Sequence, residues 1–266
     1  MEYIDAHSHI WGKQSDAEPE EFTAEQLLRH ALPLRVTRTV LIQMSYYRFD
    51  NTYMVAAMRR YAGVFSGVAV VDTASSQLAG EMRKLAGTGV RGFRVQPMGQ
   101  PATWLDAPGM ATMWKTCAGE GLAVCPLVDA NALASIDRMC GRFPDTRVVI
   151  DHLARIGVDG QIRDGDVQQL CGLARHKNVY VKASAFYALG TKRYPYTDLA
   201  PLIERVVKAY TPERVMWATY CPYQVEGGHT YAGSLELVRD RLPFLSANDR
   251  EWILSRTAAR VFFHER

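Results

Sequence analysis

The sequence predicts an α/β fold in which eight parallel strands and their connecting helices close into a (β/α)8 TIM barrel. Two observations support this prediction: short apolar or β-branched runs alternate with stretches of helical spacing, and there are eight such runs. The runs lie near residues 2–6, 39–43, 64–71, 90–96, 122–128, 147–151, 178–184 and 213–219. Because no linker or low-complexity segment interrupts the pattern, we expect one domain over residues 1–266.

Helices are predicted between these runs. Thr23 and Gln26 have the spacing of a capping box, which would open a helix that continues to about residue 31. Asp50 is a candidate cap for a helix that ends near Arg60. The remaining helices are expected near residues 75–86, 109–119, 130–142, 166–176, 198–209, 234–242 and 248–263.

Composition narrows the classes of protein to consider. A formal charge of +3, carried by scattered basic residues, argues against a nucleic-acid partner. The five cysteines are odd in number and form no C-x-x-C pair, which argues against a disulfide framework. The sequence contains no apolar stretch of membrane-spanning length and no basic-then-apolar start. We therefore expect a cytoplasmic protein with neither a nucleic-acid nor a membrane partner. Its substrate is expected to be a small molecule, and the chain could form a homo-oligomer.

The end of the first strand carries the strongest functional signal. His7 and His9 are one residue apart, so their side chains point the same way from a strand. Two convergent imidazoles can hold one metal ion or bind one anionic substrate. In a barrel of this kind, chemistry takes place at the carboxyl ends of the strands, so the other strand ends are the places to search.

Charged groups stand out at three of those ends because a charge within a strand is costly unless it is paired or used. Arg94 is a candidate carboxylate clamp, or else an ion-pair partner of Asp72 or Asp129. Lys182 is either a substrate contact or a structural ion-pair partner, and His152 is either a functional imidazole or a backbone hydrogen-bond partner.

Further candidates come from the loops. Gln43 ends the second strand, and Tyr46 and Tyr47 follow it as substrate contacts or ordinary loop aromatics. Cys221 has no paired base in a recognisable motif, so it is not expected to be a nucleophile. His229, in the loop after the eighth strand, is an additional candidate.

Several segments together resemble the amidohydrolase superfamily and, within it, the branch that includes sugar lactonases and 2-pyrone-4,6-dicarboxylate lactonase. The resemblance runs nearly end to end and implies a distorted barrel of the amidohydrolase type with hydrolytic activity. The motifs are His7-Ser-His9, Gly89–Arg94, Val149–Leu153, Val179–Ser184, Arg214–Tyr223 and Trp252–Phe263.

Two departures from the family pattern affect the chemistry. The family's last strand usually ends with an aspartate that binds metal or accepts a proton from the attacking water, and Tyr220 stands there instead. Leu127 and Val128 occupy the place of the family's strand-five histidine, whose absence is usual in the lactonase branch. A neutral phenol is a poor base, but it can donate a hydrogen bond to a developing oxyanion.

The metal content follows from the same residues. His7, His9 and His152 supply the minimum of three ligands for zinc, and the missing aspartate lowers the affinity. We expect either no cofactor or one weakly bound divalent metal, with zinc the first choice. In a metal-free site the same imidazoles would polarise a substrate carbonyl.

Three functions fit the sequence. The first is a lactonase-type hydrolase of a small carboxylated cyclic ester, in which His7, His9, His152 and Tyr220 are catalytic. In this case Tyr220 at the aspartate position would impair hydrolysis, and if it replaces an original aspartate, Tyr220→Asp should raise turnover by orders of magnitude. The second is a non-hydrolytic lyase, such as a decarboxylase or dehydratase, in which the phenol transfers protons. The third is a catalytically silent binding protein on the same barrel.

Overall fold

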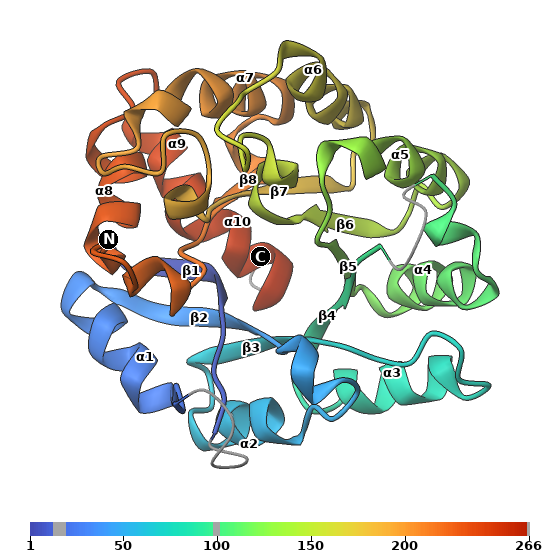
Figure 1. The fold of residues 1–266 in the computed structure, drawn as a ribbon. Helices are drawn as coiled ribbons and strands as arrows, with labels where there is room; N and C mark the ends of the chain where they lie inside the picture. The colour runs from blue at the N-terminus through green and yellow to red at the C-terminus, as the bar shows by residue number, and fades with distance from the viewer. Residues whose placement is uncertain (13–19, 98–101, 265–266) are drawn as a thin grey trace.

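The computed structural model describes residues 1–12, 20–97 and 102–264, and eight parallel strands follow one another around its sheet in chain order (Figure 1). This arrangement is the predicted (β/α)8 barrel. The strands are β1 (Tyr3–Ser8), β2 (Val36–Ile42), β3 (Phe65–Ala69), β4 (Val90–Val95), β5 (Ala123–Pro126), β6 (Arg147–Ile150), β7 (Val179–Ala183) and β8 (Val215–Trp217).

The barrel is nearly closed between its first and last strands. Ser8 forms a parallel bridge with Cys221, just beyond β8. The His9 N–H donates to the Cys221 carbonyl at 2.8 Å, and the Tyr220 N–H donates to the His7 carbonyl at 2.8 Å. Closure therefore brings the segment after β8 directly beside the two histidines at the end of β1.

Helices surround the ring of strands, as the alternating pattern predicts (Figure 1). They are α1 (Ala24–Ala31), α2 (Thr52–Arg60), α3 (Leu78–Ala86), α4 (Pro108–Glu120), α5 (Leu133–Arg142), α6 (Asp164–Gly172), α7 (Ala200–Tyr210), α8 (Tyr231–Asp240), α9 (Ala247–Glu251) and α10 (Thr257–Phe262). A π-helical turn over Trp252–Arg256 joins α9 to α10. No helix formed by the described residues is both long and apolar enough to cross a bilayer.

The predicted capping signals are confirmed in one case and shifted in the other. Thr23 and Gln26 form both hydrogen bonds of a capping box at the start of α1. For α2, Asn51 rather than Asp50 is the N-cap, although the Asp50 carboxylate accepts a hydrogen bond from the Thr52 N–H at 2.9 Å. The shift arises because an aspartate can bond to a backbone N–H two residues on without itself being the cap.

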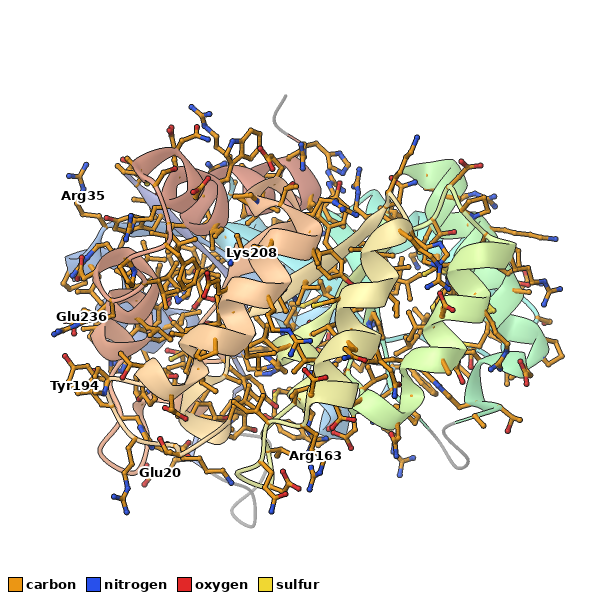
Figure 2. The ribbon with its side chains drawn as sticks, turned by 90° about the horizontal axis from the view of Figure 1, so that it is seen from above. Glu20, Arg35, Arg163, Tyr194, Lys208 and Glu236 are labelled. Carbon is orange, nitrogen blue, oxygen red and sulfur yellow. The ribbon has the colours of Figure 1, made fainter. Side chains whose placement is uncertain are left out.

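One end of the barrel is closed by α10. Ala258, Val261 and Phe262 pack against residues that point into the barrel, including Ile4 and Met216. The opposite end is open to the loops that follow the strands. Glu20, Arg163 and Tyr194, from three of these loops, lie toward this end, while Arg35 lies toward the other (Figure 2). We call the open end the barrel mouth.

Candidate functional site

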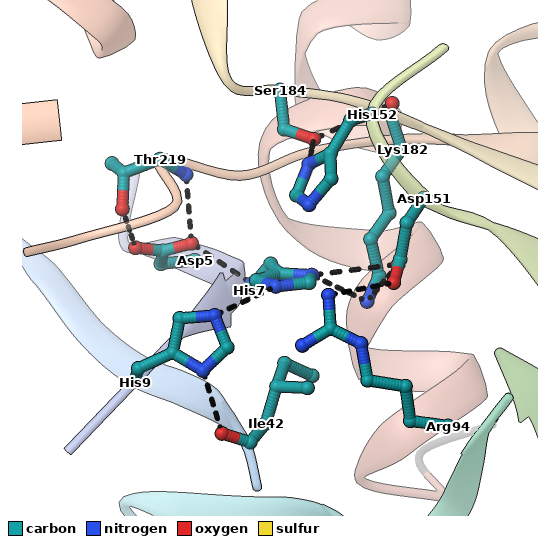
Figure 3. A network of polar contacts seen from close by, with 10 residues as sticks. All are labelled: Asp5, His7, His9, Ile42, Arg94, Asp151, His152, Lys182, Ser184 and Thr219. Carbon is teal, nitrogen blue, oxygen red and sulfur yellow. Dashed lines mark hydrogen bonds and ion pairs between the residues drawn. The ribbon is translucent and has the colours of Figure 1, made fainter. Parts of the chain in front are cut away.

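The three predicted histidines converge at the barrel mouth (Figure 3). The ring centroids of His7 and His152 are 4.4 Å apart, and those of His7 and His9 are 5.1 Å apart. The Nε2 atoms of His7 and His9 are separated by 3.3 Å. All three side chains are buried, so the cluster lies at the base of the mouth rather than on its rim.

Tyr220 covers this cluster. Its ring stacks on His152 with centroids 4.3 Å apart and an interplanar angle of 24°, and it lies 5.0 Å from His7 and 5.2 Å from His9. Its φ of 73° is in the left-handed region, which is rare for a bulky residue. The phenol therefore contacts all three imidazoles.

A buried ion cluster lies beside the histidines. Asp151 Oδ1 is 3.0 Å from Lys182 Nζ and 3.4 Å from His7 Nδ1, and Asp151 Oδ2 is 3.9 Å from Arg94 Nη2. Lys182 thus forms an ion pair, one of the two roles considered for it, and its contact with substrate stays a prediction. Arg94 pairs with neither of the two carboxylates considered from the sequence; Asp129 pairs with Arg155 at 3.3 Å instead.

Asp151 is a site residue that sequence reasoning did not select. It precedes His152 at the end of β6, and the rule that marked Arg94 and Lys182 as costly strand charges applies equally to it. The cluster contains two cations and one carboxylate, and therefore carries one net positive charge. Such a site favours an anionic ligand.

Burial controls the protonation of these groups. It lowers the pKa of His7 and His9 well below the usual imidazole value, and it lowers that of His152 to about 3. Burial alone would raise the pKa of Asp151, but Lys182 and His7 outweigh it and hold this pKa well below its usual range. At neutral pH the three imidazoles are therefore neutral and Asp151 is an ionised carboxylate.

Hydrogen bonds fix part of the tautomer pattern. His9 Nδ1 lies 2.8 Å from the Ile42 carbonyl, which can only accept, so in the neutral ring Nδ1 carries the proton and Nε2 is a lone pair. His152 Nδ1 lies 2.8 Å from Ser184 Oγ. Within the described chain, His152 Nε2 is buried without a hydrogen-bond partner, which leaves it available to a ligand.

The turn that presents His152 is strained. His152, Leu153, Ala154 and Arg155 have consecutive φ values of 53°, 54°, 53° and 54°. Left-handed conformations cost roughly 1–2 kcal/mol for each non-glycine residue. Strain of this kind persists where the surrounding structure enforces it and is common at functional sites.

Asp5 joins the two strands that close the barrel. Its carboxylate accepts hydrogen bonds from the backbone N–H groups of His7 and Thr219, at 3.0 Å each, and from the hydroxyls of Ser8, Thr219 and Tyr231. Burial raises its pKa, against the opposing effect of these donors. Asp5 therefore holds the backbones that carry His7 and Tyr220, a role that the sequence pattern did not reveal.

The predicted loop residues lie in two environments. Gln43 borders a cavity beside the cluster, and its amide donates to the Asp50 carbonyl. The Tyr47 hydroxyl accepts from the Gly12 N–H at 3.1 Å, and its ring stacks near Tyr53, so it stabilises the loop after β1. Tyr46 is 40% exposed and contacts the ring of Tyr47 at 4.9 Å between centroids.

The remaining two candidates are Cys221, whose backbone joins the strand of His9, and His229 in the loop after β8. Cys221 is buried, and burial raises the pKa of its thiol, as expected for a cysteine that is not a nucleophile. His229 Nδ1 is 2.7 Å from the Tyr196 hydroxyl, and its ring lies 5.9 Å from that of Tyr187. It contributes to the loop structure at the edge of the mouth.

A divalent cation fits part of this arrangement. Among the described residues, His7, Asp151 and His152 place ligand atoms within 4.8 Å of one another, a set that differs from the predicted one by replacing His9 with Asp151. The 3.3 Å between the Nε2 atoms of His7 and His9 also matches two nitrogens of a tetrahedral zinc, which lie roughly 3.3 Å apart when Zn–N is about 2.0–2.1 Å.

Comparison with known proteins gives one family. A family model described as amidohydrolase matches residues 4–263. An L-fucono-1,5-lactonase of Burkholderia ambifaria is 27% identical over 243 residues, covering 85% of this chain and 82% of the relative. A 2-pyrone-4,6-dicarboxylate hydrolase of Comamonas testosteroni is 27% identical over 237 residues, covering 83% and 76%.

The fold also matches a solved structure. The crystal structure of an amidohydrolase from Burkholderia multivorans with bound zinc superimposes with a TM-score of 0.85. The two sequences are 20% identical, and the match covers 99% of each chain.

Proposed function

This chain belongs to the amidohydrolase family, and we propose that it hydrolyses the ring ester of a small carboxylated lactone. The relatives named above support a hydrolase of the lactonase type. The proposal that the substrate carries a carboxylate rests on one observation. The buried cluster formed by Lys182, Arg94 and Asp151 has a net positive charge, and it lies beside three neutral imidazoles.

Arg94 binds the substrate carboxylate in this proposal. Its Nε and Nη2 atoms are buried, and neither has a hydrogen-bond partner in the part of the chain that the structure describes. A guanidinium presents such nitrogens as a fork that matches the two oxygens of a carboxylate. The substrate carboxylate would also neutralise the excess positive charge of the cluster.

His152 accepts the proton of the attacking water. If Nδ1 donates to Ser184 Oγ, whose hydroxyl faces the Lys182 carbonyl at 3.5 Å, the lone pair lies on the unpartnered Nε2. As the water oxygen bonds to the lactone carbonyl carbon, its proton moves to Nε2. The same proton returns to the ring oxygen when the carbon–oxygen bond breaks, which leaves a hydroxy acid.

Tyr220 stabilises the oxyanion that forms on the carbonyl oxygen. Its ring stacks on His152, which places the phenol beside the proposed base. A neutral phenol can donate a hydrogen bond to the developing charge, and one such donor typically contributes a factor of about 10²–10³ to the rate.

A metal at this site would be weakly bound. When present, it would lower the pKa of a water molecule and so supply hydroxide. His7, Asp151 and His152 would hold it, but the Lys182 ammonium lies 3.0 Å from Asp151 and 3.2 Å from His7 and repels a second cation there. We expect calorimetric zinc titration to give weak binding, with tighter binding in Lys182→Met.

Labelled water tests the reaction class. Opening a carboxylated lactone in H₂¹⁸O should place one ¹⁸O in the new carboxylate, as measured by mass spectrometry. Product without label would instead indicate a lyase, and binding without any product would indicate a silent binding protein.

Substitutions at Tyr220 test its role. Tyr220→Phe should lower kcat about 10²–10³-fold because it removes the oxyanion donor. Tyr220→Asp removes the same donor but adds a second proton acceptor beside His152, whose pKa burial lowers to about 3, and turnover should rise if transfer of the water proton limits the rate. Tyr194→Phe, at a 52% exposed position, is the matched control and should leave kcat unchanged. Equal rates in Tyr220→Phe and the unsubstituted protein would exclude the donor role.

A further inference from the structure

We propose that the substrate's lactone ring carries an apolar substituent, and that this group enters a cavity beside the histidine cluster. The proposal rests on the proposed function, and it distinguishes this chain from a lactonase for polyhydroxylated sugars. It is argued from the cavity's position, its wall and its hydrogen bonds.

The cavity lies at the ends of β2, β3 and β4 and has a volume of about 500 Å³. This volume is within the range of small-molecule pockets. Its wall is predominantly apolar, and five residues supply that surface: Phe49, Val70, Val71, Val95 and Met110. Three of these, Val71, Val95 and Met110, are at least nine-tenths buried.

The cavity adjoins the proposed reaction site through Arg94. Arg94 lines it and also lies 3.9 Å from Asp151 in the buried cluster. Gln43 lines it as well, and the preceding residue, Ile42, accepts the hydrogen bond from His9. A molecule whose carboxylate binds Arg94 can therefore reach both the imidazoles and the cavity.

Some polar groups of the wall already have partners within the chain. The backbone of Val70, which lines the cavity, is engaged by Asn51: its carbonyl accepts from the Asn51 amide at 2.8 Å, and its N–H donates to the Asn51 side-chain oxygen at 3.1 Å. The Gln43 amide donates to the Asp50 carbonyl. A ligand hydroxyl placed against the valines and the methionine would lose its hydrogen bonds to water without replacing them, which is unfavourable.

Other polar side chains of the lining lie toward the entrance. Ser45, Arg48 and Gln96 are exposed, and Asp72 and Thr73 are half-buried. In the inner part of the lining, Val71, Val95 and Met110 lie with Gln43, whose amide is already engaged, and with Arg94, which binds the substrate carboxylate in the proposed function. The apolar surface beside Arg94 suits a group such as a phenyl ring or a branched alkyl chain.

Three matched probes test the inference. They are γ-lactone carboxylates that differ only in one ring substituent, which is hydrogen, hydroxymethyl or phenyl. We expect kcat/KM for the phenyl compound to exceed that for the hydroxymethyl compound about tenfold or more, because hydrophobic pockets discriminate on this scale. Val70→Trp fills the cavity and should bring the ratio close to one. Leu32→Trp, at a 53% exposed position on the outside of the barrel, should leave the ratio unchanged.

A binding measurement separates failure of the inference from failure of the proposed function. The ring-opened phenyl product should bind in isothermal titration calorimetry with a negative heat-capacity change, and more weakly to Val70→Trp. Binding with no turnover of any lactone would support the apolar cavity and overturn the hydrolase. Turnover of all three lactones without a phenyl preference would overturn the inference alone. Absence of both binding and phenyl preference would also overturn it.

Discussion

Replacing Asp151 by asparagine tests whether one buried carboxylate compensates two cations at the barrel mouth. Asparagine has nearly the same shape but no charge, so Lys182 and Arg94 would both lose their negative partner. The side chains of Lys182 and Asp151 are 0% exposed, which means that water cannot replace the lost interaction. We therefore expect a large loss of stability.

The magnitude follows from the burial of the pair. Removing one partner of a buried ion pair costs about 3–5 kcal/mol of unfolding free energy. For a chain of this size, each kcal/mol lowers Tm by roughly 2–4 °C, so Asp151→Asn should lower Tm by roughly 6–20 °C. Lys182→Met should lower the unfolding free energy by less. In this variant Asp151 keeps Arg94 as a partner and the cluster becomes neutral, whereas in Asp151→Asn the net charge of the cluster rises from one to two.

Circular dichroism melts and urea titrations of the two variants and their double mutant would measure these differences. The matched control is Asp159→Asn, which removes a pair with Arg163 at 2.6 Å whose side chains are 48% and 52% exposed, and it should cost less than about 1 kcal/mol. The reasoning would be refuted if Asp151→Asn were no more costly than this control, or if Lys182→Met were the more damaging substitution.

Two further predictions concern the rest of the barrel. Among the cysteines, Cys171 alone is partly exposed and the other four are buried. Iodoacetamide at pH 8 should therefore label mainly Cys171 in the native protein and all five cysteines after unfolding, as measured by mass spectrometry. Rapid labelling of Cys117 in the native protein would contradict this, because burial raises the pKa of its thiol well above the usual value. Gly109→Ala should lower unfolding free energy by about 1–3 kcal/mol, because its Cβ would lie 1.7 Å from the Thr73 carbonyl oxygen. Gly80→Ala, with nothing within 4 Å of the new Cβ, should instead stabilise helix α3 by about 0.5–1 kcal/mol.

Much of the fold could be predicted because its signals are local. Apolar runs of strand length and the Thr23 capping box depend on residues close together in the sequence, and both appear in the structure where the pattern placed them. The Asp50 cap was misplaced by one residue, since a carboxylate can serve more than one N–H near a helix start. The position of the site at the barrel mouth followed from the topology of parallel strands.

The candidate site was only partly predictable. His7 and His9 could be paired from their spacing, and His152 could be added because all strand ends of a barrel share one mouth. The partners of Arg94 and Lys182 could not be read in this way, because Asp151 is distant from both in the sequence and the geometry of β4, β6 and β7 decides which carboxylate they meet. The hydrogen bonds by which Asp5 joins β1 to the segment after β8 were missed for the same reason, because Asp5 and Thr219 are far apart in the sequence.

By itself, the sequence determined that histidines and charged side chains lie at the ends of several strands, because periodicity and spacing depend only on the order of residues. Only the tertiary structure decided which charges neutralise one another, how deeply the imidazoles are buried and what kind of wall adjoins them. The physical reason is that protonation and ligand preference depend on distance and on exclusion of water. Both are properties of packed surfaces formed by segments such as Asp5 with Thr219, or Asp151 with Lys182, which meet only when the barrel closes.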